Sequence, residues 1–141
     1  RIVTKTIMKS FLKKKILLHG NGLSKRSFIY IEDACEANLK VLLNGKSGET
    51  YHISTNKIVS IKGLVQKISN KTNSRFKDLI KNSKDRKGKD HSYKLDSRKI
   101  RKKLHWRDKI SLDQGINLTV KWIKDNFNYL KKQPLEYKHK K

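Results

Sequence analysis

The chain has 141 residues, of which 36 are Lys or Arg and 12 are Asp or Glu, so its formal net charge is +24. A hydrophobic content of 35% is too high for a disordered polycation, and the length suits one domain with a moderate core. No apolar run approaches the roughly 18 residues of a membrane-spanning helix, and a single cysteine excludes an internal disulfide framework. We therefore expect a cytoplasmic protein without a membrane span.

The first half of the chain predicts alternating helices and strands. Residues 2–12 carry apolar side chains at helical spacing, and residues 16–19 form a short apolar strand that ends at a turn over 20–22. Residues 27–31 and 49–54 predict two further strands, because both are rich in β-forming residues. Asp33 is expected to cap a helix over 33–43. The buried side of that helix is expected to carry Ala34, Cys35, Ala37, Val41 and Leu42.

The second half is dominated by helices. Ser60 is a suitable cap for a helix over 61–70, and a short helix is expected near 76–80 within the polar segment 71–90. Residues 92–95 predict an extended piece, after which Asp96 or Ser97 caps a short helix ending near residue 104. Ser111 or Asp113 begins the last long helix, and residues 133–141 form a basic tail. The alternation of helices and short strands predicts an α/β fold.

The positive charge is spread along the chain and is mostly lysine. Specific base and phosphate recognition favours the forked guanidinium of arginine, and no aromatic-interleaved strand motif accompanies the lysines. We therefore interpret the charge chiefly as a solvated surface. A basic nucleic-acid-binding module is the alternative from another functional class, and nucleic acid is not the expected partner.

The sequence contains no complete catalytic apparatus. It has no Gly-x-Gly-x-x-Gly or Gly-x-x-x-x-Gly-Lys phosphate loop, and its five histidines do not have metal-ligand spacing. No catalytic residue and no metal site is expected in these 141 residues.

Four segments, taken in order, resemble the extended short-chain dehydrogenases/reductases that act on nucleotide sugars. The segments are GNGLSKRSFIYIED at 20–33, GETYHIS at 48–54, DRKGKD at 85–90 with YKLD at 93–96, and KIRKKLHW at 99–106 with LDQGINLTVKW at 112–122. Within the NAD-dependent epimerase/dehydratase family, the pattern is most similar to dTDP-glucose 4,6-dehydratases. Each motif is weak by itself, whereas this order and spacing form a strong signal.

The resemblance implies that residues 1–132 are the C-terminal, nucleotide-sugar-binding region of an extended Rossmann-type enzyme. The N-terminal half, which in the family binds NAD and carries the catalytic residues, is expected to precede residue 1. Residues 34–55 would return to the Rossmann-like sheet as a helix and a final strand, and the remaining segments would form a small substrate-binding lobe. The fragment alone is expected to be inactive, and the complete enzyme is expected to be a homodimer.

The resemblance also implies a substrate-binding set. Arg26 follows a glycine turn and is expected to bind the diphosphate, and Arg86 is the second candidate, beside a glycine that permits close approach of the backbone. Residues 17–19 match a segment that contacts the nucleotide, and residue 52 stands where dehydratases often have Asn. The full expected set is Arg1, Leu17, Leu18, His19, Arg26, His52, Asp85, Arg86, Lys87, Gly88 and Lys89. The residues interpreted as packing residues are Trp106, Leu112, Gly115 and Trp122.

The expected role is to orient a nucleotide-diphosphate sugar for oxidation at C4 and loss of water across C5–C6. An epimerase or reductase of the same family is the alternative that the residues leave open. A third interpretation is a non-catalytic remnant, in which faces meant for the Rossmann half are exposed and make the chain dependent on a partner.

Overall fold

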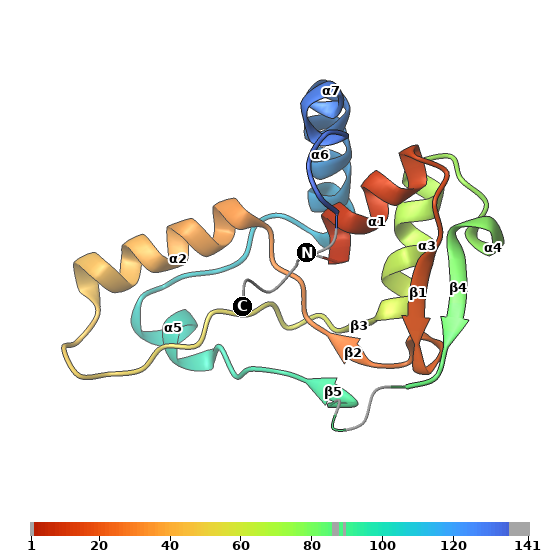
Figure 1. The fold of residues 1–141 in the computed structure, drawn as a ribbon. Coiled ribbons are helices and arrows are strands. Elements are labelled where there is room, and N and C mark those ends of the chain that lie inside the picture. The colour runs from red at the N-terminus through yellow and green to blue at the C-terminus, as the bar shows by residue number, and fades with distance from the viewer. Residues whose placement is uncertain (1, 86–87, 89, 136–141) are drawn as a thin grey trace, which may run out of the picture.

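The computed structural model describes residues 2–85, 88 and 90–135 (Figure 1). Three helices form its main core: α1 (Ile2–Phe11), α3 (Ile61–Lys71) and α6 (Leu112–Asp125). A short helix α7 (Phe127–Leu130) follows α6, and Phe127 meets Phe11 edge to face with ring centroids 5.9 Å apart. The buried side chains at the centre of this core are Ile7, Met8, Leu64, Ile68, Ile116, Val120 and Ile123. The apolar periodicity at these positions therefore predicted the three helices and their buried faces correctly.

Two parallel strands lie beside this helical core. The expected strand β1 (Ile16–His19) pairs with β4 (Ile80–Ser83), which was not expected from the sequence. A short helix, α4 (Phe76–Leu79), precedes β4. β4 was missed because its central residues, Lys81 and Asn82, are polar and exposed, so the segment lacks an apolar alternation. The chain turns from β1 through a 3-10 helix (Gly20–Gly22).

A second small sheet carries the strand with the candidate diphosphate ligand. Its order is β3-β2-β5, in which β2 (Lys25–Arg26) is antiparallel to β3 (Val59–Ser60) and parallel to β5 (Ser92–Tyr93). The strand expected over 27–31 is therefore wrong, since β2 ends at residue 26 and a helix begins at residue 31. The strand expected over 49–54 is also absent, because neither segment has a pairing strand among the described residues.

Helix α2 (Ile31–Asn44) and helix α5 (Arg98–Lys103) enclose a separate apolar cluster. Trp106 is its largest side chain and is fully buried, in contact with Ala37, Ile100 and Leu104. The interpretation of Trp106 as a packing residue is confirmed. Trp122, in contrast, is 55% exposed, so its interpretation as a packing residue is wrong in this chain.

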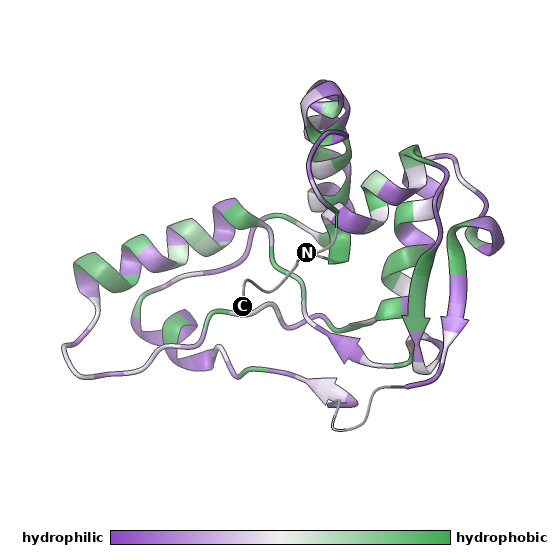
Figure 2. Cartoon of the chain, in the orientation of Figure 1, coloured by the Kyte–Doolittle hydropathy of each residue, from purple (hydrophilic) through white to green (hydrophobic). Residues whose placement is uncertain are grey.

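Much of the apolar surface of α2 is exposed. Cys35 is exposed and Leu42 is 80% exposed, so the prediction that both line the buried side of the helix is wrong. Ile31, Leu39 and Leu43 are exposed too, and Figure 2 shows apolar residues recurring along this helix although it lies apart from the main core. Its side toward Trp106 is covered, whereas these apolar side chains on its other side are exposed.

The helix caps follow the sequence in part. The Ser60 and Ser111 side chains accept hydrogen bonds from the amides of Gly63 and Gln114, as expected. At α5, Ser97 occupies the cap position, while the carboxylate of Asp96 accepts from the amide of Arg98. Asp33 does not cap α2, whose cap position is Tyr30.

Two observations bear on the wider organisation of the chain. At the start of the expected basic tail, Leu135 packs against the main core, and 136–141 lie outside the described residues. Among the residues that the structure describes, no helix has the length and apolar character needed to cross a membrane.

Candidate substrate-binding site

Several of the predicted site residues meet where β1 ends and β2 begins. The Nδ1 atom of His19, the last residue of β1, lies 3.3 Å from the carbonyl oxygen of Lys84. Gly20 follows with a φ of +56°, and a Cβ at this position would collide with the carboxylate of Asp85. Glycine is therefore favoured here for two reasons: the backbone is in the left-handed region, and the Asp85 carboxylate occupies the space that a Cβ would need. The turn after β1 and the loop beginning at residue 84 are thus in direct contact.

Arg26 lies on β2, the central strand of the small sheet, and is anchored to the same loop. Its guanidinium donates from Nη1 to the carbonyl oxygen of Lys25 at 2.7 Å and from Nη2 to that of Asp90 at 2.8 Å. The amide of Lys25 donates to the carbonyl oxygen of His91 at 2.8 Å, which ties β2 to the end of the loop. A guanidinium has five N–H donors, so donors beyond these two contacts remain for a ligand.

The loop itself is described only in part. Gly88 is exposed with a φ of +70°, and no atom of the described residues beyond its chain neighbours lies within 4 Å of the position where its Cβ would stand. Arg86, Lys87 and Lys89 lie outside the described residues, as does Arg1.

Segment 50–54 contacts the residue after Arg26 through the side chain of Ser54. The hydroxyls of Ser27 and Ser54 are 3.0 Å apart, so this segment runs beside the residue that follows Arg26. His52 is exposed on the same segment. Leu17 is exposed on β1, whereas Leu18 is buried against Val65 and Leu79, so its side chain belongs to the core and does not face a ligand.

Asp96 stands near His52 and is held in its ionised form. Hydrogen bonds from the side chain and the amide of Arg98 lower the pKa of Asp96 to about 2, and the charges of Arg98 and His52 act in the same direction. The Arg98 Nη2 atom is 2.6 Å from the carboxylate.

Replacing Arg98 with Gln is expected to raise the pKa of Asp96 from about 2 toward its ordinary value of 3.8. Since the folded-state pKa is depressed, the pair stabilises the chain fully above pH 3.8 and loses this effect as the pH falls toward 2. A carboxyl-carbon NMR titration of both proteins measures the shift. Identical titration curves would contradict the assigned partner.

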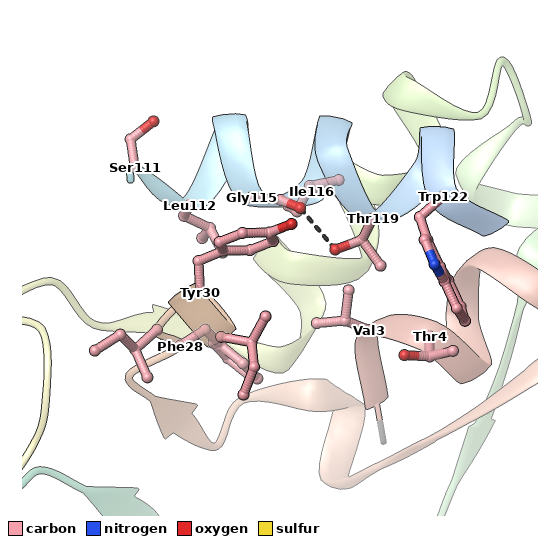
Figure 3. A pocket seen from close by; sticks show the side chains of 12 residues that line it. Val3, Thr4, Phe28, Tyr30, Ser111, Leu112, Gly115, Ile116, Thr119 and Trp122 are labelled. Carbon is pink, nitrogen blue, oxygen red and sulfur yellow. Dashed lines mark hydrogen bonds between the residues drawn. The ribbon is translucent and has the colours of Figure 1, made fainter. Parts of the chain in front are cut away.

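A separate apolar groove of about 560 Å³ lies between the start of α2, α1 and α6 (Figure 3). The Tyr30 ring lies against Gly115, where an added Cβ would come within 3.1 Å of it, and the Thr119 hydroxyl donates to the carbonyl oxygen of Gly115 at 2.7 Å. Trp122 closes one end of the groove. This groove was not predicted from the sequence, although its aromatic residues lie within the motifs at 20–33 and 112–122.

The described residues at this site offer a held guanidinium and further hydrogen-bonding groups. They contain no cluster of three or more His, Cys, Asp or Glu residues that could hold a metal ion. The arrangement of Arg26, His19 and the loop after β4 suits recognition of an anionic, polar ligand, because charge-assisted hydrogen bonds from a held guanidinium are strong and directional.

Comparison with known proteins gives the family. The family model described as GDP-mannose 4,6 dehydratase matches residues 1–119. The human dTDP-D-glucose 4,6-dehydratase is 35% identical over 133 residues, which cover 91% of this chain and 38% of the human protein.

Solved structures of related enzymes have a similar fold over most of this chain. A dTDP-glucose 4,6-dehydratase from Bacillus anthracis, in complex with NAD, superposes with a TM-score of 0.86 at 29% identity, covering 96% of this chain and 42% of that one. An enzyme of the same name from Streptomyces venezuelae, solved with NAD and TDP bound, gives 0.85 at 27% identity, covering 93% and 40%. The chain therefore spans about two fifths of the length of these relatives, as expected for the C-terminal portion of an extended Rossmann-type α/β enzyme. It belongs to the GDP-mannose 4,6-dehydratase family of NAD-dependent extended short-chain dehydrogenases/reductases.

Proposed function

We propose that this chain is the substrate-binding part of an NAD-dependent nucleotide-sugar dehydratase and that it orients the sugar diphosphate. The observation that carries the proposal is the Arg26 guanidinium, fixed by the carbonyl oxygens of Lys25 and Asp90 beside the 84–90 loop. A guanidinium held in this way is pre-organised for a diphosphate, so little side-chain freedom is lost on binding. The family and the TDP-bound relative support this choice of ligand.

The proposed role of this chain follows from how the reaction is shared between the NAD-binding part and the substrate-binding part of such an enzyme. In the dehydratases that the chain resembles, NAD accepts a hydride from the sugar C4, water leaves across C5–C6, and the hydride returns to C6. The described residues include no Gly-rich NAD-binding turn, so their contribution is to hold the sugar nucleotide in place. Arg86, Lys87, Gly88 and Lys89 are proposed to contact the diphosphate from the loop. His19 and His52 are proposed to contact the nucleotide or sugar.

Arg26→Ala is expected to weaken binding of TDP to the chain by about tenfold to a hundredfold, because one charge-assisted hydrogen-bonding group contributes roughly 1.5–3 kcal/mol. Titration of the ¹⁵N-labelled chain with TDP, followed by NMR, measures the dissociation constant. Arg75→Ala is the matched control, since Arg75 is an exposed arginine whose Nε donates to Asp78 on α4. Equal affinities in the wild type and Arg26→Ala would refute the assignment of Arg26.

The exposed side of α2 is proposed to be covered by the NAD-binding part of the complete enzyme. Ile31, Cys35, Leu39 and Leu42 follow one another at helical spacing on this side, and Ile31 also lines the apolar groove. The helix and the groove therefore form a continuous apolar surface, which is typical of a face that packs against protein. About 60% of the length of the relatives lies outside the region that this chain matches. The homodimer and the cytoplasmic location stay predictions.

Cys35 provides a direct measure of that contact. In the 141-residue chain its thiol is expected to react with a maleimide at the rate of an exposed cysteine. In a protein that also contains the NAD-binding part, the rate is expected to fall at least about tenfold, since burial blocks access to the thiolate. Mass spectrometry of the peptide that contains Cys35 measures both rates, and equal rates would show that this side of α2 stays uncovered.

A further inference from the structure

Arg101 on α5 connects three parts of the lobe through one side chain. Its Nη2 atom donates to the carbonyl oxygen of Ser54 at 2.9 Å and to the carboxylate of Asp108 at 2.6 Å, and its Nε donates to the Ser97 hydroxyl at 3.0 Å. The guanidinium also lies over the ring of Trp106, 5.0 Å from its centroid. Only 18% of the side chain is exposed, in contrast to 80% for Arg98 on the same helix.

The charge of Arg101 is matched locally. Partial burial acts to raise the pKa of Asp108, but hydrogen bonds from Arg101 and Thr55 outweigh this effect and lower it below its ordinary value. The carboxylate therefore stays ionised and keeps the guanidinium in one orientation, with Nη2 shared between Asp108 and the Ser54 carbonyl and Nε bound to Ser97.

The contact with Ser54 leads to the candidate diphosphate ligand. Residues 50–54 belong to no strand, so no ladder of backbone hydrogen bonds fixes them among the described residues. The bond from Arg101 to the Ser54 carbonyl holds this segment, and the Ser54 hydroxyl lies 3.0 Å from that of Ser27. Ser27 directly follows Arg26, so the path from α5 to Arg26 consists of two hydrogen bonds and one peptide unit.

We propose that Arg101 is a positioning residue for the substrate site: it fixes segment 52–54 and, through Ser54 and Ser27, the backbone that presents Arg26 to a diphosphate. The inference rests on the proposed function for the role of Arg26. Arg101 would thus contribute to the binding affinity without touching the ligand. A guanidinium that is held in place binds a diphosphate more tightly than one that must be ordered on binding.

The test is a double-mutant cycle on the 141-residue chain, with TDP as the probe. Arg101→Lys keeps the charge but loses the fork, and Ser54→Ala removes the hydroxyl that contacts Ser27 while leaving the Arg101 contact with the Ser54 carbonyl possible. Each variant is expected to weaken TDP binding by about fivefold to tenfold, and the double variant is expected to bind no worse than the weaker single variant, since both interrupt one path. Arg75→Lys, at the exposed arginine that precedes α4, is the control and is expected to leave the affinity unchanged.

Thermal unfolding is measured alongside, so that a purely structural role can be recognised. If Arg101→Lys lowers the melting temperature but the folded variant binds TDP with wild-type affinity, the positioning role is overturned. Should Arg101→Lys not fold, Ser54→Ala decides alone, and wild-type affinity in that variant overturns the path. If Arg26→Ala weakens TDP binding and the Arg101 and Ser54 variants do not, only this inference is overturned. Absence of TDP binding by the wild-type chain would overturn the proposed function, and the assignment of Arg101 with it.

Discussion

Trp106→Ala is expected to lower the free energy of unfolding by about 3–5 kcal/mol, the usual cost of removing a large buried aromatic side chain. The indole is fully buried, fills the space between α2 and α5, and donates from Nε1 to the carbonyl oxygen of Asp33 at 3.1 Å. Its loss therefore creates a cavity and removes the hydrogen bond from the indole to the Asp33 carbonyl. The guanidinium of Arg101 also loses the ring beneath it.

Urea unfolding followed by circular dichroism measures this effect. Trp122→Ala is the matched control, because Trp122 is the other tryptophan of the chain and is 55% exposed. Its replacement is expected to change the free energy of unfolding by less than about 1 kcal/mol. Equal losses in the two variants would contradict the packing of α2 and α5 around Trp106.

Asp33→Ala is the second large expected effect, at about 2–4 kcal/mol, since it leaves two backbone donors without an acceptor. Asp33 is buried on α2, and its two carboxylate oxygens accept from the amides of Lys109 at 3.0 Å and Ile110 at 2.9 Å. The side chain therefore fastens α2 to the segment that leads into α6. Removal of the carboxylate leaves these two N–H groups unpaired within a part-buried contact.

The neighbouring acidic residue supplies the control for Asp33. Glu32 is exposed on the same turn of α2, and Glu32→Ala is expected to cost less than about 0.5 kcal/mol. Hydrogen exchange at the amides of Lys109 and Ile110 gives a local readout, and both are expected to exchange faster in Asp33→Ala. Unchanged exchange at these two amides would show that the carboxylate does not hold the segment.

The helices were predictable because their evidence is local. Apolar residues at a spacing of three and four, with a serine before the first turn, placed α3 within one residue of its observed limits and placed the start of α6 within its observed first turn. Trp106 and Gly115 were expected to be packing residues and are buried. These features depend on residues close in sequence, and they need no knowledge of the rest of the fold.

The errors share a different cause. The segments 27–31 and 49–54 have strand-like sequences, but strands require a pairing neighbour, and none is present among the described residues. The apolar residues of α2 were expected to be buried, yet Leu42 and Cys35 have no described element beside them. The sequence pattern indicates burial without specifying what covers the surface, and the relatives are more than twice the length of this chain.

The role of Asp33 and the links of Arg26 depended on distant partners. The carboxylate of Asp33 was expected to cap its own helix. It instead accepts hydrogen bonds from the amides of Lys109 and Ile110, which are 76 and 77 positions away. Arg26 was chosen from the glycine turn before it, and its contact with Asp90, 64 positions away, became visible only in the structure. Pairings over such separations leave no periodicity in the sequence.

The measurement that tests the central claim most directly is made on a complete enzyme. The region of the Bacillus anthracis dehydratase that matches this chain is replaced by residues 1–132, and the kinetics are measured with dTDP-glucose. The account predicts a protein that retains NAD, forms the 4-keto-6-deoxy product, and shows a KM raised about tenfold to a hundredfold by Arg26→Ala with NAD still bound. A folded, NAD-containing chimera that fails to bind dTDP-glucose would contradict the claim that this chain is the substrate-binding part.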